Sequence, residues 1–249
     1  IYHYASENIY EDLASYQAKY CRPNRATIGL IFYRDEWILG DLSYQTEIIK
    51  ALEARNLNVI AVFSNGQANP DIDSEGLREA FAKYFYQDTK PIIDVLINCI
   101  KFSLTTTRAL DLAVLENLNV PILQAYTLAN NKVDWEKSCE GMTPMEISIS
   151  ISLPEFDGVI HSIPVATNER TDEGRSRYIC LPERIELLAR KVEKWTNLKY
   201  KKNSAKKVAI VFHNYPALNS NIGSAAGLDS PESVRLLLKE LARQGYEVD

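Results

Sequence analysis

The sequence predicts an α/β fold, a doubly wound parallel sheet of the flavodoxin or Rossmann type followed by the start of a second α/β unit. Two observations carry this prediction. Short, nearly continuous apolar runs, typical of strands buried on both faces, alternate with segments of helical periodicity, which is the pattern of right-handed βαβ units. The opening order of strand, loop and helix then recurs near the end of the chain.

The first unit is defined by this alternation. Thr27 opens an apolar strand, and Asp41 or Ser43 can cap the helix that follows, in which Ile48 and Leu52 share one face. Strands are predicted at 27–33, 59–63, 92–97 and 120–123. Helices are predicted between them, at 43–55, 74–85 and 106–116.

The middle of the chain is less regular. Helices are predicted at 133–139 and 144–151, and residues 153–166 are predicted to be extended. A long helix then begins at Pro182, because proline suits the first helical position and apolar residues recur behind it at helical spacing.

These elements divide the chain into four parts. They are a lead-in segment at 1–26, an α/β domain at 27–180, a helical linker at 181–206 and the start of a second α/β domain at 207–249. The last part opens with a predicted strand at 207–213 and continues with a helix at Ser230. The chain begins without Met and stops where a strand should begin, so we expect the second domain to be truncated and the chain to be a piece of a longer protein.

Composition limits the classes of function. The 249 residues carry 28 Lys+Arg and 33 Asp+Glu, a net charge of -5, which argues against binding nucleic acid or a membrane surface through bulk positive charge. No apolar run approaches the length of a membrane span, and the first residues are too polar for a signal peptide. We therefore expect a cytoplasmic protein with no nucleic-acid partner and no membrane span.

The four cysteines are widely scattered, which argues against a zinc site or a disulfide framework and fits a reducing cytoplasm. Positive charge is concentrated in the segment 190–207, where eight basic residues accompany one acid, Glu193. This segment is interpreted either as a solvated helix end that leads into a linker or as a docking surface for an anionic partner.

Candidate binding residues follow from the fold class. Ligands of open α/β sheets bind beyond the carboxyl ends of strands, which directs attention to Arg34 and Trp37 in the first unit and to His213, Asn221 and Gly223 in the second. Small residues around Asn221 and Gly223 allow a backbone to approach a flat or anionic ligand closely. Neither a dinucleotide fingerprint nor a P-loop motif is present, so any ATP is expected to be bound and hydrolysed elsewhere.

The densest group of titratable residues is Glu155, Asp157 and His161. In an extended segment these residues share parity, which would place two carboxylates and an imidazole on one side as proton acceptors or ligands of a hard metal ion. Gly158 could break that register. The alternative interpretation is a turn followed by an edge strand with exposed polar groups.

Several longer motifs follow one another along nearly the whole chain. They are Phe32-Tyr33-Arg34-x-x-Trp37-x-x-Gly40, Ala51-Leu52-Glu53-Ala54-Arg55, Trp135-Glu136 with Gly141-Met142-Thr143-Pro144, Leu153-Pro154-Glu155-Phe156-Asp157-Gly158, and Asn221-Ile222-Gly223-x-Ala225-x-Gly227-Leu228-Asp229-x-Pro231-x-Ser233. In this order the motifs resemble the large subunit of the CobN-type cobaltochelatases, and the closely related magnesium-chelatase large subunit (H-type) is similar.

The resemblance implies a very large cytoplasmic subunit that binds a tetrapyrrole and hosts insertion of a divalent metal, while separate AAA+ subunits hydrolyse ATP. Carried over by motif, Glu155 is the principal catalytic candidate, since metal insertion releases two pyrrole protons that a carboxylate can accept. Asp157 and His161 would assist it, and Glu155 and His161 are the candidate metal ligands. Arg34 or His213 would meet the carboxylate or amide periphery of the ring.

The resemblance implies insertion of Co²⁺ into a corrin precursor in cobalamin biosynthesis, because Phe32-Tyr33-Arg34 and Gly227-Leu228-Asp229-Ser230-Pro231 look like the cobalt type. The Leu39-Gly40-Asp41 stretch is shared with the magnesium type, so a magnesium-chelatase subunit acting on protoporphyrin is an alternative. A non-catalytic tetrapyrrole-binding module and a scaffold that docks the motor subunits are further alternatives. We expect the isolated fragment to be inactive.

Overall fold

The computed structural model describes the chain except residues 7, 69–70, 72–74, 109, 172–173, 175, 226 and 249. The chain divides into two compact units, Ile1–Thr196 and Asn197–Asp249. No helix in the described part of the chain combines the length and the apolar character that are needed to cross a bilayer.

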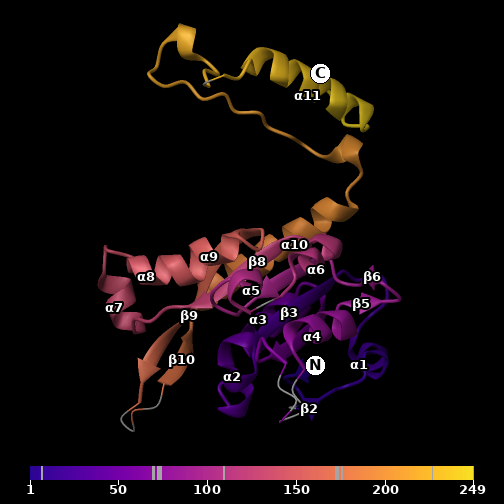
Figure 1. Cartoon of the computed structure of the whole chain (residues 1–249), viewed down its shortest axis with the longest axis vertical. Coiled ribbons are helices and arrows are strands. Elements are labelled where there is room, and N and C mark those ends of the chain that lie inside the picture. The colour runs from indigo at the N-terminus through magenta and orange to yellow at the C-terminus, as the bar shows by residue number, and fades with distance from the viewer. Residues whose placement is uncertain are drawn as a thin grey trace. The chain divides into compact units, whose positions relative to one another are not determined.

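The first unit is built on a mixed sheet with strand order β10-β9-β8-β7-β3-β4-β1-β2 (Figure 1). Its strands are β1 (Tyr2–His3), β2 (Asn8–Ile9), β3 (Thr27–Tyr33), β4 (Asn58–Ser64), β7 (Val95–Asn98), β8 (Ile122–Thr127), β9 (Val159–Arg170) and β10 (Ser176–Cys180). From β4 to β9 all neighbours are parallel, whereas β1, β2 and β10 pair antiparallel at the two edges.

The parallel strands have the flavodoxin-like order 2-1-3-4-5 when they are numbered along the chain. The chain moves outward from β3 to β4 and then returns to β7 on the other side of β3, so the strand order reverses between β3 and β7. The predicted doubly wound α/β fold is therefore confirmed for the first unit, and its topological switch point is at the carboxyl ends of these two strands.

Helices cover both faces of the sheet. They are α1 (Leu13–Tyr20), α2 (Arg34–Ile38), α3 (Ser43–Glu53), α4 (Leu77–Tyr84), α5 (Leu104–Arg108), α6 (Leu112–Leu118), α7 (Lys132–Lys137), α8 (Pro144–Ile147), α9 (Leu153–Glu155) and α10 (Pro182–Tyr200). The apolar faces of α3 and α10 pack with one side of the strands, and those of α1, α4 and α6 pack with the other. A two-residue hairpin of β5 (Tyr86–Gln87) and β6 (Lys90–Pro91) follows α4.

The strands form where the apolar runs predict them, because both of their faces are covered. Ile28, Leu30 and Phe32 of β3 point into one layer of the core and Ile31 into the other. All four side chains are fully buried. Burial of about 25 cal/mol for each Å² of apolar surface is what stabilises such a strand.

Two segments at the borders of the first unit have more structure than the sequence predicts. Residues 1–26, predicted as a lead-in, supply β1, β2 and α1, and Tyr2 pairs with Ala61 of β4. Residues 182–196 of α10, in the predicted linker, bury Ile185, Leu188 and Val192 in the core of the sheet. Both segments gain their position from tertiary packing, which a boundary drawn from local pattern does not detect.

The connection from β8 to β9 also differs from its prediction. Residues 153–166 were expected to be extended, but α8 continues through a π-helical turn, η2 (Ser148–Ser152), into α9, and β9 starts only at Val159. Pro154 lies at the first positions of α9, where its missing N–H costs no hydrogen bond. Proline at this point therefore begins a helical turn and does not interrupt a strand.

The second unit contains the helix α11 (Ser230–Arg243), with Asp229 as its N-cap, and the short turns η3 (Asn203–Ala205) and η4 (Asn219–Asn221). The predicted strand at 207–213 is absent, and its Val211 and Phe212 are 89% and 43% exposed. A strand exists only when a neighbour pairs with its backbone along its length. Among the described residues, only the N–H of Gly223 bonds to the backbone of this segment, at the His213 carbonyl. Isolated bridges join Asn214 to Ile222 and Ala225 to Leu228.

Candidate functional site

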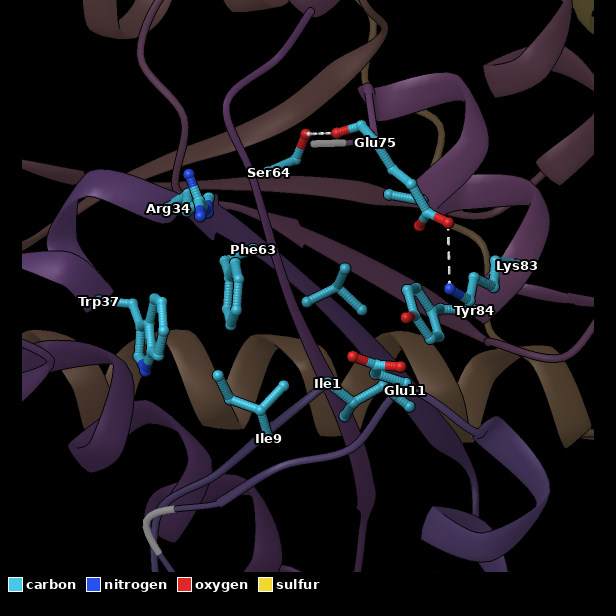
Figure 2. A pocket seen from close by; sticks show the side chains of 12 residues that line it. Ile1, Ile9, Glu11, Arg34, Trp37, Phe63, Ser64, Glu75, Lys83 and Tyr84 are labelled. Carbon is cyan, nitrogen blue, oxygen red and sulfur yellow. Dashed lines mark hydrogen bonds and ion pairs between the residues drawn. The ribbon is translucent and has the colours of Figure 1, made fainter. Parts of the chain in front are cut away.

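The candidate site is a hollow of about 320 Å³ at the carboxyl ends of β3 and β4 (Figure 2). Helix α2, the end of β4 and helix α4 supply most of its walls, and the β1–β2 region closes it below. Its lining residues are Ile1, Ile9, Glu11, Arg34, Trp37, Val62, Phe63, Ser64, Glu75, Ala80, Lys83 and Tyr84. The predicted binding residues Arg34 and Trp37 are thus brought together in one hollow.

Helix α2 places these two residues. The strand β3 ends at Tyr33 and α2 begins at the next residue, so positions three apart on this short helix face the same way. The Trp37 indole stacks on the Phe63 ring with centroids 5.1 Å apart and planes 4° from parallel. Figure 2 shows Arg34 beside this stacked pair, which gives the hollow an aromatic wall with a cation next to it.

One basic side chain of the hollow has an ion-pair partner and another has none among the described residues. On the wall opposite α2, Lys83 Nζ donates a hydrogen bond to Glu75 Oε1 at 3.0 Å, and this bond raises the pKa of the lysine. The guanidinium of Arg34 makes no hydrogen bond or ion pair with any described residue. Arg34 is therefore free to form a bidentate contact with a carboxylate that enters the hollow.

Two further ionisable residues, which the sequence does not predict as site residues, lie at the same edge of the sheet. Glu36, on α2, is buried and accepts hydrogen bonds from Tyr44 and Gln45 of α3. Lys101 follows β7 at the switch point and is half-buried. Burial lowers the pKa of Lys101, while the charges of Glu146 and Glu36 raise it. The rule that identified Arg34 could have identified Lys101, since both follow strands that flank the switch point.

Like Arg34, Lys101 carries a cationic group without a hydrogen-bond or ion-pair partner among the described residues. Its carbonyl accepts from Tyr33 Oη at 3.1 Å. A half-buried ammonium without a partner is costly unless a ligand or water satisfies it. The switch point therefore holds a second cation that is available to an anionic group.

The structure does not bring Glu155, Asp157 and His161 together. Glu155 is exposed at the end of α9, Asp157 is buried and His161 is half-buried on β9. The expected common parity is lost for two reasons. Residues 153–155 are helical, and the pairing of Ile122 with Val159 but Leu123 with His161 inserts one extra residue into β9. The sequence expectation of a shared face is therefore wrong.

Hydrogen bonds occupy both carboxylate oxygens of Asp157. Its carboxylate accepts from Leu104 N at 2.6 Å, from Ser103 Oγ at 2.8 Å and from Thr105 N and Oγ1 at 3.1 and 2.7 Å. These groups form the first turn of α5. A carboxylate at the start of a helix satisfies N–H groups that have no partner within the helix. Asp157 thus holds the loop before β9 against α5.

His161 lies near α10. Its ring is 6.2 Å from that of Trp195, and burial, followed by the charge of Lys191, lowers its pKa, so the imidazole is neutral at pH 7. Glu155 lines a different hollow, of about 610 Å³, at the amino ends of β8 and β9. Its carboxylate forms no hydrogen bond or ion pair with described residues. This hollow includes exposed Phe156 and the ring of Trp195.

No cluster of three or more His, Cys, Asp or Glu side chains that could hold a metal ion occurs in the described ranges. Of the candidate metal ligands, Glu155 is an isolated exposed carboxylate and His161 packs beside Trp195. The described residues therefore offer a metal ion no ready-made set of three ligands.

The remaining predicted binding residues belong to the second unit. The Gly223 N–H donates to the His213 carbonyl at 2.7 Å, and Asn221 Nδ2 donates to the Pro216 carbonyl at 2.9 Å. Gly223 has a φ of +71°, and an added Cβ would lie 2.6 Å from the Phe212 ring. Gly223 and Asn221 therefore shape a loop that leaves the His213 side chain exposed.

The chain matches a family of known proteins. A family model described as CobN/Magnesium Chelatase matches residues 1–249. An uncharacterized protein of Methanocaldococcus jannaschii is 38% identical over 91% of this chain and 19% of its own length. The aerobic cobaltochelatase subunit CobN of Pseudomonas aeruginosa is 28% identical over 90% of this chain and 18% of its own length.

The magnesium branch is as similar as the cobalt branch. The chloroplastic magnesium-chelatase subunit ChlH of Oryza sativa is 28% identical over 100% of this chain and 18% of its own length. The solved catalytic subunit of cobaltochelatase from Mycobacterium tuberculosis matches with a TM-score of 0.73 and 25% identity, covering 91% of this chain and 19% of that one. The chain thus spans about a fifth of the length of these relatives.

Proposed function

The chain belongs to the CobN/magnesium chelatase family, and from this premise we propose that it is part of the large subunit of an ATP-dependent chelatase. The proposed reaction inserts Co²⁺ into a tetrapyrrole corrin precursor in cobalamin biosynthesis. The match of the family model to every residue supports the proposal most strongly. The equal identity to a CobN and a ChlH subunit favours neither metal, so insertion of Mg²⁺ into protoporphyrin is the second candidate.

The hollow on β3 and β4 is the proposed contact with the tetrapyrrole. Trp37 and Phe63 offer a flat apolar wall, and the unpaired Arg34 beside them suits a carboxylate on the periphery of the ring. Its volume of about 320 Å³ lies at the small end of ligand pockets. We infer that the hollow receives one edge of the ring and that other parts of the subunit cover the remainder.

Glu155 remains the proposed proton acceptor for a ring that binds in its own hollow. That hollow lies at the opposite end of the strands from Arg34, so a ring held by Arg34 would need another acceptor. Metal insertion must remove two pyrrole protons, and an exposed carboxylate without a partner can accept one and also attract the incoming dication. The bonds of Asp157 to α5 fix the loop that presents Glu155. We therefore assign Asp157 a supporting role and leave His161 out of the reaction.

ATP is proposed to act through partner subunits of the AAA+ type. The basic segment 190–207 is the candidate docking surface, since Lys194, Lys199 and Lys201 are exposed. Reversing these three charges to Glu should weaken assembly of the complex, as measured by co-purification of the subunits. Unchanged assembly would leave the segment as a solvated helix end and linker.

The main test uses the full subunit with its partners, a tetrapyrrole and Co²⁺ or Mg²⁺ in parallel. Glu155→Gln should abolish metal insertion, followed by the absorbance of the metallated ring, while binding of the metal-free ring is retained. Glu116→Gln is the matched control because Glu116 lines the same hollow from α6. Full turnover by Glu155→Gln would remove Glu155 from the mechanism, and binding without insertion by the wild-type complex would favour a non-catalytic module.

A further inference from the structure

The buried carboxylate of Glu36 connects the helix that carries Arg34 and Trp37 to the rest of the first unit. Tyr44 Oη donates to both of its oxygens, at 2.9 and 3.0 Å, and Gln45 Nε2 donates to Oε2 at 2.6 Å. Both donors belong to α3. The hydroxyl of Tyr178, on β10, also hydrogen-bonds the carboxylate.

These contacts attach α2 to its neighbours through a buried side chain. The helix has only five residues, and Ile38 faces solvent with 56% of its side chain exposed. Glu36 is 9% exposed and Trp37 is held on one side by Phe63. A helix this short has little stability of its own, so its position depends on such tertiary contacts.

We propose that Glu36 is a positioning residue, which in its protonated form holds α2 so that Arg34 and Trp37 face the hollow on β3 and β4, and which weakens that hold when it is ionised. Arg34 and Trp37 lie two residues before and one residue after Glu36. Any change in the attachment of this carboxyl group is therefore transmitted directly to both side chains.

The surroundings place the protonation of Glu36 near neutral pH. Burial raises its pKa to about 7, against the hydrogen bonds from Tyr44, Tyr178 and Gln45, which lower it, while the charge of Asp41 raises it further. Two other ionisable groups, both in the loop after β7, interact electrostatically with the carboxylate. Cys99 is buried, and burial raises the pKa of its thiol, so it is neutral. The ammonium of Lys101 interacts electrostatically with Glu36.

Gln45 gives the neutral carboxyl group an alternative partner. The Oε1 atom of Gln45 is buried and accepts no hydrogen bond. A half-turn of the amide would exchange its oxygen and nitrogen, so that the protonated Glu36 could donate to Oε1 at the short distance normal for an O–H donor. In that state no charge is buried, so the protonated group holds α2 more firmly even though the bonds from Tyr44 and Tyr178 are no longer charge-assisted.

The attachment of α2 through Glu36 does not depend on any ligand. Its use in tetrapyrrole binding rests on the proposed function. If both hold, Arg34 presents its guanidinium to a ring carboxylate more firmly below pH 7 than above it. Trp37 shows the position of α2 without a ligand, so the two claims can be tested separately.

The test follows quenching of Trp37 fluorescence by acrylamide between pH 5.5 and 8.5, a window about the midpoint near 7, in the full chain with Trp135 and Trp195 replaced by phenylalanine. Acrylamide is neutral, so its quenching constant measures exposure of the indole and not local charge. The constant should rise as the pH rises through about 7, because the ionised group is costly to bury. In Glu36→Gln it should be low and independent of pH, since glutamine resembles the protonated form.

Two further variants complete the test. Tyr178→Phe removes a donor that favours the ionised form and should move the midpoint to higher pH, which an exclusively structural role would not do, and it serves if Glu36→Gln does not fold. Asp35→Asn, at an exposed position of the same helix, should leave the midpoint unchanged. No transition near pH 7 in the parent, or a transition retained in Glu36→Gln, would overturn the proposal without affecting the proposed ligand.

Discussion

The two hollows that contain predicted site residues lie at opposite ends of the parallel strands and are built differently. The hollow at the carboxyl ends of β3 and β4 has an aromatic wall, an unpaired Arg34 and a supporting buried carboxylate. The hollow at the amino ends of β8 and β9 has one free carboxylate, Glu155, beside exposed Phe156. The first resembles a ligand site in its composition, whereas the second offers a single reactive group.

This difference shows which inferences from sequence transfer to structure. Arg34 and Trp37 were found from a rule about where strands end, and that rule reflects the architecture of every open α/β sheet. Glu155, Asp157 and His161 were grouped because they are close in sequence. Closeness in sequence does not fix direction, and a helical turn and one extra strand residue turn the three side chains apart.

The largest effect should separate the two carboxylates at the amino ends of the strands. Asp157→Ala should lower the free energy of unfolding by about 3 to 5 kcal/mol, because it leaves buried donors of α5 without an acceptor. Glu155→Ala should change it by no more than about 0.5 kcal/mol. Urea denaturation measures both. Similar losses in both variants would contradict the division into a structural and an exposed carboxylate.

The next effect concerns the carboxyl-end hollow and pH. Glu36 ionises near 4.5 in the unfolded chain but only at about 7 in the folded one, so the folded state binds the extra proton between these values. Its contribution to the free energy of unfolding should therefore fall as the pH rises from about 4.5 to 7, by on the order of 3 kcal/mol, and stay constant above.

The measurement is the difference between wild type and Glu36→Gln in urea unfolding over this pH range. Taking the difference cancels the titration of the groups that both proteins share. The gap between the two curves should change with pH only across that window. A gap that does not depend on pH would mean that Glu36 is ionised throughout.

A smaller effect tests the ligand. Arg34→Gln should weaken binding of a tetrapyrrole carboxylate to the full subunit by roughly tenfold, or about 1 to 2 kcal/mol, because one charge-assisted contact is lost. Arg25→Gln is the matched control, since Arg25 is exposed before β3, at the opposite end of that strand. Titration of the ring, followed by absorbance, measures both. Equal affinities of the Arg34→Gln and Arg25→Gln variants for the ring would show that the ring does not bind in this hollow.

The smallest effect is expected at the amino-end hollow. Phe156 is 67% exposed, and Phe156→Ser should change tetrapyrrole affinity by no more than about 0.5 kcal/mol if the ring binds at the carboxyl ends. The same titration reports it. A loss larger than that of Arg34→Gln would reverse the assignment and make the hollow beside Glu155 the contact with the ring.

The elements of the first unit were largely predictable. The apolar runs at 27–33 and 59–63 correspond closely to β3 and β4, since a strand buried on both faces needs apolar residues at successive positions. The run at 207–213 has the same pattern and forms no strand. Pattern predicts the capacity to be a strand, but pairing of N–H and C=O groups with a neighbour makes one.

The site was predictable in part. Position after a strand was enough to identify Arg34 and Trp37, but not their stacking partner Phe63, which comes from β4. Glu36 lies between Arg34 and Trp37 in the sequence, but its supporting role could not be predicted. Nothing local distinguishes a solvated glutamate from one that Tyr44, Gln45 and Tyr178 enclose, because those residues come from α3 and β10.

The sequence by itself determined the alternation of elements, the family and the residues at the ends of strands, because each depends on residue types in a local order. The tertiary structure alone decided that Asp157 holds a helix, that Glu155 stands free and that a buried glutamate supports the candidate site. Those roles depend on which distant groups surround a carboxyl group, and its surroundings set its solvation, its hydrogen bonds and its charge.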